Sequence, residues 1–336
     1  LDVIGSFLFP SLIVDIEPGE TQSLNLLLEN IGSLTATGVT AELAFQGTEV
    51  IINNSSASWG NIQPGFPIPC EECFNITVSN DVISGTQVML LLQIESEDGY
   101  NRSESILMSI GRESETDPLG PDQYGYYIYD SGDIDYNLVP IYDWIEIDPG
   151  NGGNGTDLNL SHSGNGNWNG TPIADVNLPF SFSFYGIEYS EITVSTNGWI
   201  AFGGTDMESF RNYPIPGAGG PSPMIAAFWD DLKTTSGGDV STYSTGDSFI
   251  IQWDDMSTQN NNSDETFQII LYNDSAPPYG DNTAKIQYKD FNNTSSGNFN
   301  SYPPIHGGYA TIGTENHLGD DGLQYTFNNV YPPAAM

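Results

Sequence analysis

The sequence predicts an all-β protein built from two β-sandwich domains, and three observations lead to this fold class. First, short runs of alternating apolar and polar residues recur along all 336 residues, separated by clusters of Gly, Pro and Asn. Second, no window combines a 3.6-residue apolar period with capping residues, so no amphipathic helix is expected. Third, residues 177–232 hold the densest apolar and aromatic sequence, with Asn197-Gly198 between two apolar runs. Asn-Gly in that setting is a strong β-hairpin signal, because both residues accept positive φ.

The first predicted domain covers residues 1–112. Its strand patterns alternate apolar and polar residues, with turn residues such as Asn30-Ile31-Gly32 between them. Strands spaced this way are typical of an immunoglobulin-like sandwich. The polar, turn-rich residues 113–121 are predicted to form a linker. The expected strands of this domain are 24–29, 39–45, 74–78, 88–94 and 105–110.

The second predicted domain, residues 122–336, is a larger sandwich around the dense stretch. Phe180, Phe182 and Phe184 recur at every second position, which is the period of a strand with one buried face. The apolar run 224–229 is expected to be a core strand that delivers Asp230-Asp231 to a sandwich edge or loop. Further strands are expected at 124–129, 144–147, 192–194, 199–202, 249–253, 267–272, 284–288, 309–313 and 323–327.

Two motifs in the dense stretch resemble the nidogen-like extracellular domain. These are Thr196-Asn197-Gly198-Trp199 and the run from Ile225 to Asp231, in which Ala227 stands where that family usually has Pro. Residues 118–335 are similar to a module attached to secreted bacterial proteins, including peptidases. Residues 1–112 resemble bacterial Ig-like cell-adhesion and peptidase-associated modules. The resemblance implies fold and an extracellular location, but no particular activity.

Acidic residues greatly outnumber basic ones. The chain has 44 Asp and Glu against 6 Lys and Arg, which gives a formal net charge of −38. Such a chain repels nucleic acid and anionic membrane surfaces, so neither is an expected partner. The expected electrostatic partners are cations, above all Ca²⁺, which prefers carboxylate and carbonyl oxygens. The alternative is that the charge serves only solubility.

One short acidic loop is the candidate calcium site. Asp130, Asp133 and Asp135 place three carboxylates close together in the sequence, and Asp320-Asp321 forms a second acidic turn. Neither loop has the EF-hand spacing. Acidic turns without a bound ion are equally compatible with so acidic a chain.

No catalytic motif is recognised, and the protein is predicted not to be an enzyme. His162, His306 and His317 lie in loop-like contexts, and neither a G-x-S-x-G nor an H-E-x-x-H motif is present. Asp230-Asp231 and Asp254-Asp255 are carboxylate pairs of the kind that hydrolyse sugars. Adjacent Asp residues after an aromatic strand more often form a turn or an ion site.

The two cysteines, Cys70 and Cys73, form a C-x-x-C motif. A thioredoxin-like redox site would need a βαβ context, and a zinc site would need two further ligands. A local disulfide in an exported protein fits the sequence best.

Asparagine-linked sugars are expected on loops. The alternative is that an Asn-, Ser- and Thr-rich chain forms N-x-S/T triplets by chance. Trp168 and Trp59 are candidates for stacking on a bound sugar, against the simpler interpretation that each covers an edge. The candidate acceptors are Asn53, Asn54, Asn75, Asn101, Asn154, Asn159, Asn169, Asn261, Asn273, Asn292 and Asn293.

The ends suggest a mode of assembly. Residues 1–9 are apolar and strand-like but lack a basic region, so they predict neither a signal peptide nor a membrane span. The resembling modules continue past the sequence near residue 335 into one more strand. We therefore expect residues 1–9 to act as a donor strand that completes the second domain of a neighbour, giving a head-to-tail fibre of identical chains. The alternatives are a fragment or stalk module of a secreted peptidase, or a carbohydrate- or calcium-binding module.

Overall fold

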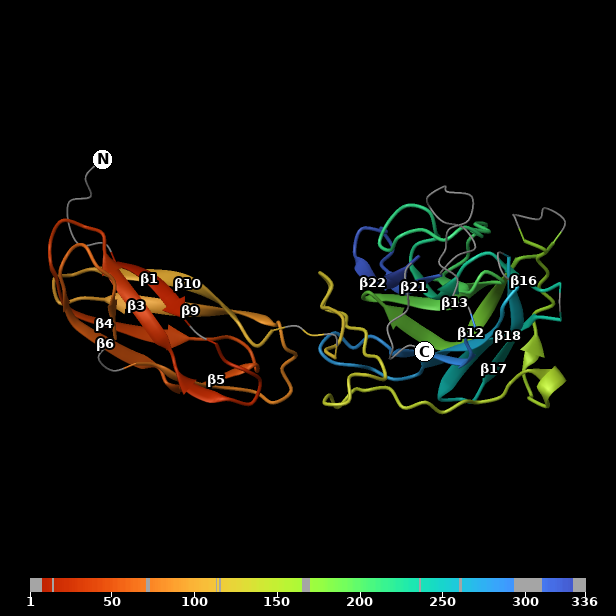
Figure 1. Ribbon diagram of the computed structural model, residues 1–336, viewed down its shortest axis with the longest axis horizontal. Helices are drawn as coiled ribbons and strands as arrows, with labels where there is room; N and C mark the ends of the chain where they lie inside the picture. The colour runs from red at the N-terminus through yellow and green to blue at the C-terminus, as the bar shows by residue number, and fades with distance from the viewer. Residues whose placement is uncertain are drawn as a thin grey trace. The chain divides into compact units, whose positions relative to one another are not determined.

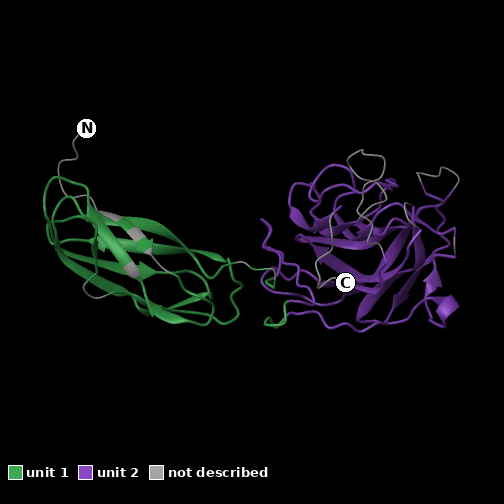
Figure 2. Cartoon of the chain, viewed as in Figure 1, with its two compact units in different colours: residues 1–117, 133–137 green, residues 118–132, 138–336 purple. Residues whose placement is uncertain are grey.

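The chain forms two compact units (Figure 2), each built from β-sheets in a computed structural model. One unit comprises Leu1–Asp117 and Asp133–Asn137, and the other comprises Pro118–Gly132 and Leu138–Met336. The all-β prediction is confirmed, and the one short helical turn described is η1, Pro149–Asn151. The structure describes residues 8–13, 15–70, 73–112, 114, 116–164, 170–235, 237–259, 262–292 and 310–328.

The first unit contains three small antiparallel sheets (Figure 1). Their strand orders are β1-β3-β7, β2-β8-β5 and β10-β9-β4-β6. Side chains that alternate inward along these strands form one apolar core, in which Trp59 and Phe74 pack edge to face at 6.2 Å. The strands are β1 (Leu8–Ile13), β2 (Thr21–Ser23), β3 (Asn25–Asn30), β4 (Ala36–Ala44), β5 (Val50–Asn54), β6 (Ser56–Ile62), β7 (Ile68–Pro69), β8 (Asn75–Val78), β9 (Gln87–Glu95) and β10 (Asn101–Ser109).

Strand β1 belongs to the first unit's own sheet. It pairs antiparallel with β3, with Leu8 opposite Asn30 and Phe9 opposite Glu29. Residues 8 and 9 of the proposed donor segment are therefore used within their own unit. Residues 1–7 lie outside the described residues.

The second unit contains two six-stranded sheets. One has the order β11-β17-β18-β19-β20, with β16 also paired to β18, and the other has the order β12-β13-β14-β15-β21-β22. The core joins Phe228 of the second sheet to Phe267 of the first, with ring centroids 5.5 Å apart. The strands are β11 (Thr156–Asp157), β12 (Ile173–Phe184), β13 (Ile187–Ser195), β14 (Trp199–Phe202), β15 (Met224–Trp229), β16 (Leu232–Lys233), β17 (Asp239–Ser244), β18 (Ser248–Thr258), β19 (Asp264–Tyr272), β20 (Ala284–Asp290), β21 (Thr311–Glu315) and β22 (Gly322–Phe327).

The hairpin expected at Asn197-Gly198 is confirmed, because β13 and β14 pair across it. Of the two turn residues only Gly198 has positive φ, at 74°. Its carbonyl accepts hydrogen bonds from the amides of Ala227 and Phe228, both at 3.0 Å. This turn therefore connects the hairpin to β15 as well as joining β13 to β14.

The strands predicted at 124–129 and 144–147 are wrong. Residues 124–129 make one isolated bridge, Leu119 to Ile128, and otherwise attach through side chains, as in the 2.6 Å bond from the Tyr126 hydroxyl to Asp281. Residues 144–147 are not paired with any described strand. In both segments the apolar alternation is real, but side chains of the neighbouring sheet take the place of a backbone ladder.

A row of buried glutamines holds the segment at residues 143–147. Gln252, Gln268 and Gln287 stand opposite one another on β18, β19 and β20. The Gln268 amide donates to Gln252 Oε1 at 2.7 Å, and the Gln287 amide donates to Gln268 Oε1 at 2.9 Å. The row also binds the segment's backbone: Gln252 Oε1 accepts from the Ile147 amide at 3.2 Å, and Gln268 Nε2 donates to the Ile145 carbonyl at 2.5 Å. The segment is thereby laid across the outer face of the sheet, and it leads directly into Asp148.

Candidate functional site

A buried group of acidic side chains lies where this segment ends. Asp148 is only 2% exposed and caps η1, its Oδ2 accepting from the Asn151 amide at 2.7 Å. The following loop then folds back on the chain: the amides of Gly153 and Gly155 donate to the carbonyls of Asp148 and Ile147, each at 2.7 Å. A Cβ at Gly153 would lie 2.2 Å from the Ile147 carbonyl carbon, so only glycine fits there. The Gly-Asn loop at residues 148–155 is thus packed tightly against Asp148 and bonded to it through backbone amides.

Strands β17 and β18 supply the other side chains of this group. Asp239 and Ser241 share one face of β17 and stand opposite Asp254 and Gln252 of β18, respectively. Asp254 is held by Asn151 Nδ2 at 2.9 Å and by Gln252 Nε2 at 3.2 Å. By contrast, Asp148 Oδ1, Asp239 Oδ1 and Ser241 Oγ are all buried without a hydrogen-bond partner.

Burial and mutual repulsion favour the neutral form of the carboxyl groups in this site. Burial, together with the negative charges of Asp148, Asp157 and Asp254, raises the pKa of Asp239 to about 7. Burial and the charge of Asp148 also raise the pKa of Asp254. A proton or a cation shared between the carboxylates would relieve this repulsion.

Lys289, the base beside Glu146, is already paired. Lys289 Nζ lies 2.9 Å from Glu146 Oε2 and 5.5 Å from the centre of the Trp144 ring. Burial would raise the pKa of Glu146, but hydrogen bonds from Gln252 and Lys289 outweigh it and hold that pKa at about 2. Glu146 is therefore a satisfied anion, in contrast to Asp148 and Asp239.

The Asp230-Asp231 pair lies in the short connection between β15 and β16, in agreement with the expected edge or loop position. Both residues are fully buried, so solvent and substrate do not reach them. His162 is buried beside them, with Nδ1 2.7 Å from the Leu232 carbonyl and 3.6 Å from Asp231 Oδ1. The contact with a carbonyl makes Nδ1 a donor, so the His162 side chain binds the loop at residue 162 to the start of β16. Nothing in the local sequence around His162 signals its burial.

In the candidate calcium loop, Asp130 already has protein hydrogen-bond partners. Asp130 accepts from the Gly132 amide and from the Tyr325 hydroxyl, each at 2.6 Å. Asp133 is buried and Asp135 is exposed. Within the described ranges, no three or more His, Cys, Asp or Glu side chains are grouped so that they could hold a metal ion by themselves. The second acidic turn is also structural, since Asp321 accepts the amides of Gln123 and Tyr124.

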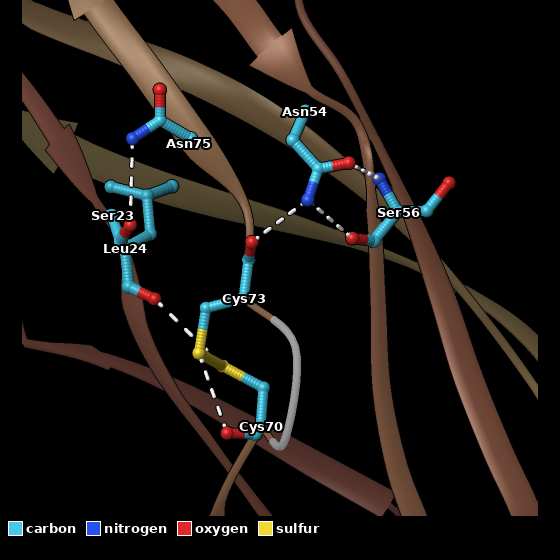
Figure 3. The surroundings of a disulfide bond; sticks show 7 residues. All are labelled: Ser23, Leu24, Asn54, Ser56, Cys70, Cys73 and Asn75. Carbon is cyan, nitrogen blue, oxygen red and sulfur yellow. Dashed lines mark hydrogen bonds between the residues drawn. A yellow bond between two sulfur atoms is a disulfide. The ribbon is translucent and has the colours of Figure 1, made fainter.

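Cys70 and Cys73 are joined in a disulfide between β7 and β8 (Figure 3). The Cys70 sulfur lies 3.9 Å from the Leu24 carbonyl, and the Asn54 amide donates to the Cys73 carbonyl at 2.9 Å. The same Asn54 amide donates to the Ser56 carbonyl at 3.1 Å. The disulfide loop thus contacts Leu24, between β2 and β3, and is bound by Asn54 at the end of β5.

The aromatic and glycan candidates differ in accessibility. Trp59 is 2% exposed, so the expectation that it stacks on a sugar is wrong, whereas Trp168 lies outside the described residues. Asn53, Asn54, Asn101, Asn154, Asn159, Asn273 and Asn292 are exposed, and Asn75 is half-buried. Asn169, Asn261 and Asn293 lie outside the described residues.

The chain is all-β and forms two units, and the larger unit is a pair of antiparallel sheets packed against each other. The chain belongs to the family described as NIDO related, whose model matches residues 155–335. The nidogen-related part of the sequence resemblance is thereby confirmed. No curated protein matches the chain.

Among solved structures, the crystal structure of Spo0M, a sporulation control protein from Bacillus subtilis, matches 74% of this chain and 79% of its own. The identity is 12% and the TM-score 0.22, so this likeness carries no argument about fold or function. Along the described residues the chain forms no helix long and apolar enough to cross a membrane.

Proposed function

We propose that this chain is a non-catalytic extracellular protein with a structural or adhesive role, a subunit of a surface fibre assembled head to tail by β-strand addition. An extracellular location is supported by membership of the NIDO-related family and by the local disulfide, which suits an oxidising compartment. The burial of Asp230 and Asp231 weighs against sugar hydrolysis at that pair.

The observation that carries the proposal is the edge position of β22. In the described part of the chain, β22 pairs with β21 on one side and has no strand partner on the other. An edge strand presents unpaired amides and carbonyls that a strand from another chain can bind. Addition of such a strand gives affinity through backbone hydrogen bonds and specificity through alternate side chains.

A second surface fits an adhesive role. Met89, Leu91 and Leu107 lie on the outer face of β9 and β10 and are 55%, 47% and 55% exposed. Leu107 stands directly opposite Met89 in the β9–β10 ladder. Apolar side chains gathered on an exposed sheet face are a common mark of protein contacts.

The donor hypothesis is tested by removing residues 1–7, because β1 starts at Leu8 and keeps its pairing with β3 in the shortened chain. We expect the full chain to form filaments in electron micrographs and the shortened chain to remain monomeric by light scattering. A synthetic peptide of residues 1–7 should block assembly of the full chain, and a scrambled peptide should not. Filaments from the shortened chain would overturn donor-strand assembly. A full chain that is monomeric under all conditions would favour the alternative, an accessory module of a secreted peptidase.

A further inference from the structure

We propose that the oxygens of Asp148, Asp239 and Ser241 form a Ca²⁺ site that ties the Gly-Asn loop at residues 148–155 to strands β17 and β18. This inference is independent of fibre assembly. It concerns a different part of the chain from the Asp130 loop.

Unpartnered oxygens on two elements carry the argument. Asp148 and Ser241 are 2% and 0% exposed, yet Asp148 Oδ1 and Ser241 Oγ have no hydrogen-bond partner, and neither does the buried Asp239 Oδ1. A buried oxygen without a partner destabilises the fold, and the cost is larger when the oxygen is charged. Buried polar atoms without a partner are rare in a stable fold, so three of them in one region indicate a cation that all three bind.

The placement of these atoms makes them neighbours although the residues are far apart in sequence. Asp239 and Ser241 point to the same face of β17, because side chains alternate along a strand. The loop closes over this face: a Cβ at Gly155 would lie 3.3 Å from Ser241 Cβ. Asn151 binds both Asp148 and Asp254, and Asp254 stands opposite Asp239 in the β17–β18 ladder, so the carboxyl groups of Asp148 and Asp239 lie in the same region under the loop.

The chemistry of the group selects a hard divalent cation. All three atoms are oxygens, and no histidine or cysteine takes part, which excludes the usual zinc and copper ligand sets. Ca²⁺ takes six to eight oxygens in flexible geometry and accepts hydroxyl, carbonyl and water ligands beside carboxylates. Two carboxylates and a hydroxyl can therefore supply part of a Ca²⁺ coordination shell that carbonyls and water complete. The described residues hold no group of three or more His, Cys, Asp or Glu side chains that could bind a metal ion, so the hydroxyl is needed as a ligand. Mg²⁺ demands a stricter octahedron and is expected to bind more weakly.

The surrounding groups hold the carboxylates in place without neutralising them. Asn151 binds Asp254 through its side chain and Asp148 Oδ2 through its backbone amide. Gln252 binds Asp254 and Glu146, and Lys289 is directed to Glu146. A bound divalent cation would supply the positive charge that no described side chain provides to Asp148 and Asp239.

The test is calcium titration of the chelator-treated full chain, followed by calorimetry and thermal unfolding. We expect saturable binding of one ion per chain, a Ca²⁺-dependent rise in Tm, and an affinity more than about tenfold weaker in Asp148→Asn and in Asp239→Asn. The matched control is Asp247→Asn, an exposed aspartate in the turn between β17 and β18, which should bind as the wild type does. Without calcium, Asp239→Asn should be at least as stable as the wild type, since it removes repulsion.

Three results would overturn the proposal. The first is no saturable Ca²⁺ binding by the wild type. The second is equal affinity in the wild type and in both site variants, which would leave a shared proton as the explanation of the carboxyl pair. The third is binding of Mg²⁺ as tight as that of Ca²⁺, which would indicate diffuse attraction by the net charge of −38.

Discussion

Replacing Glu265 with Gln tests how a buried carboxylate limits the stability of the larger unit. Glu265 lies on β19 and is fully buried. Its Oε2 accepts from the Asn292 amide at 2.8 Å, but its Oε1 has no hydrogen-bond partner. Burial raises its pKa from 4.5 to about 7, against the lowering effect of the hydrogen bonds from Ser263 and Asn292. Gln keeps the shape and the acceptor while removing the charge.

The sign and the size of the effect follow from this pKa. Because the folded-state pKa lies above the unfolded value, the contribution of Glu265 to stability is fully present below about pH 4.5 and is lost as the pH rises through about 7. A pKa difference of this size corresponds to about 3 kcal/mol. We therefore expect Glu265→Gln to match the wild type at about pH 4 and to exceed its free energy of unfolding by up to about 3 kcal/mol at about pH 8.

The assay is denaturant unfolding followed by tryptophan fluorescence at several pH values. The quantity to compare is the difference between variant and wild type, because Asp239 also titrates near neutrality and cancels in that difference. Replacement of an exposed carboxylate, as in Asp247→Asn, provides the matched control. A Glu265→Gln difference that stays constant from acid to alkaline pH would refute the reasoning.

Two further predictions concern the turn at Gly198 and the glycan sites. Gly198→Ala should destabilise the larger unit by more than about 3 kcal/mol, because its φ is 74° and its Cβ would lie 2.0 Å from the Phe228 carbonyl oxygen. Gly246→Ala, at φ 98° with open space around it, should cost only about 1–2 kcal/mol in the same denaturant titration, and equal costs would contradict the steric account. If the chain is glycosylated in its native host, mass spectrometry of glycopeptides should find Asn154 occupied more fully than Asn54. The Asn54 amide donates to the Cys73 and Ser56 carbonyls, and a glycan would take one of its two N–H donors, so that at least one of these bonds would be lost.

Local patterns in the sequence predicted much of the fold. Alternation gave the strands around residues 88–94 and 267–272, and Asn197-Gly198 marked its hairpin correctly, since both depend on neighbours within a few residues. The same alternation placed false strands at 124–129 and 144–147. Alternation reports that one face of a segment is buried, but it does not reveal whether backbone or side chains bind that segment.

The candidate sites depended far more on tertiary contacts. Acidic residues that cluster in the sequence, Asp130 among them, are the natural candidates, whereas the buried carboxylates of Asp148 and Asp239 carry no such local signal. Asp148 and Asp239 are separated in the sequence by strands β11 to β16, and only the packing of a loop over β17 brings them together. The sequence by itself determined the class of fold, the large negative charge and the family. The tertiary structure decided which carboxylates are buried as a group and which strand lies at the edge, because burial and pairing arise from contacts between residues far apart in the chain.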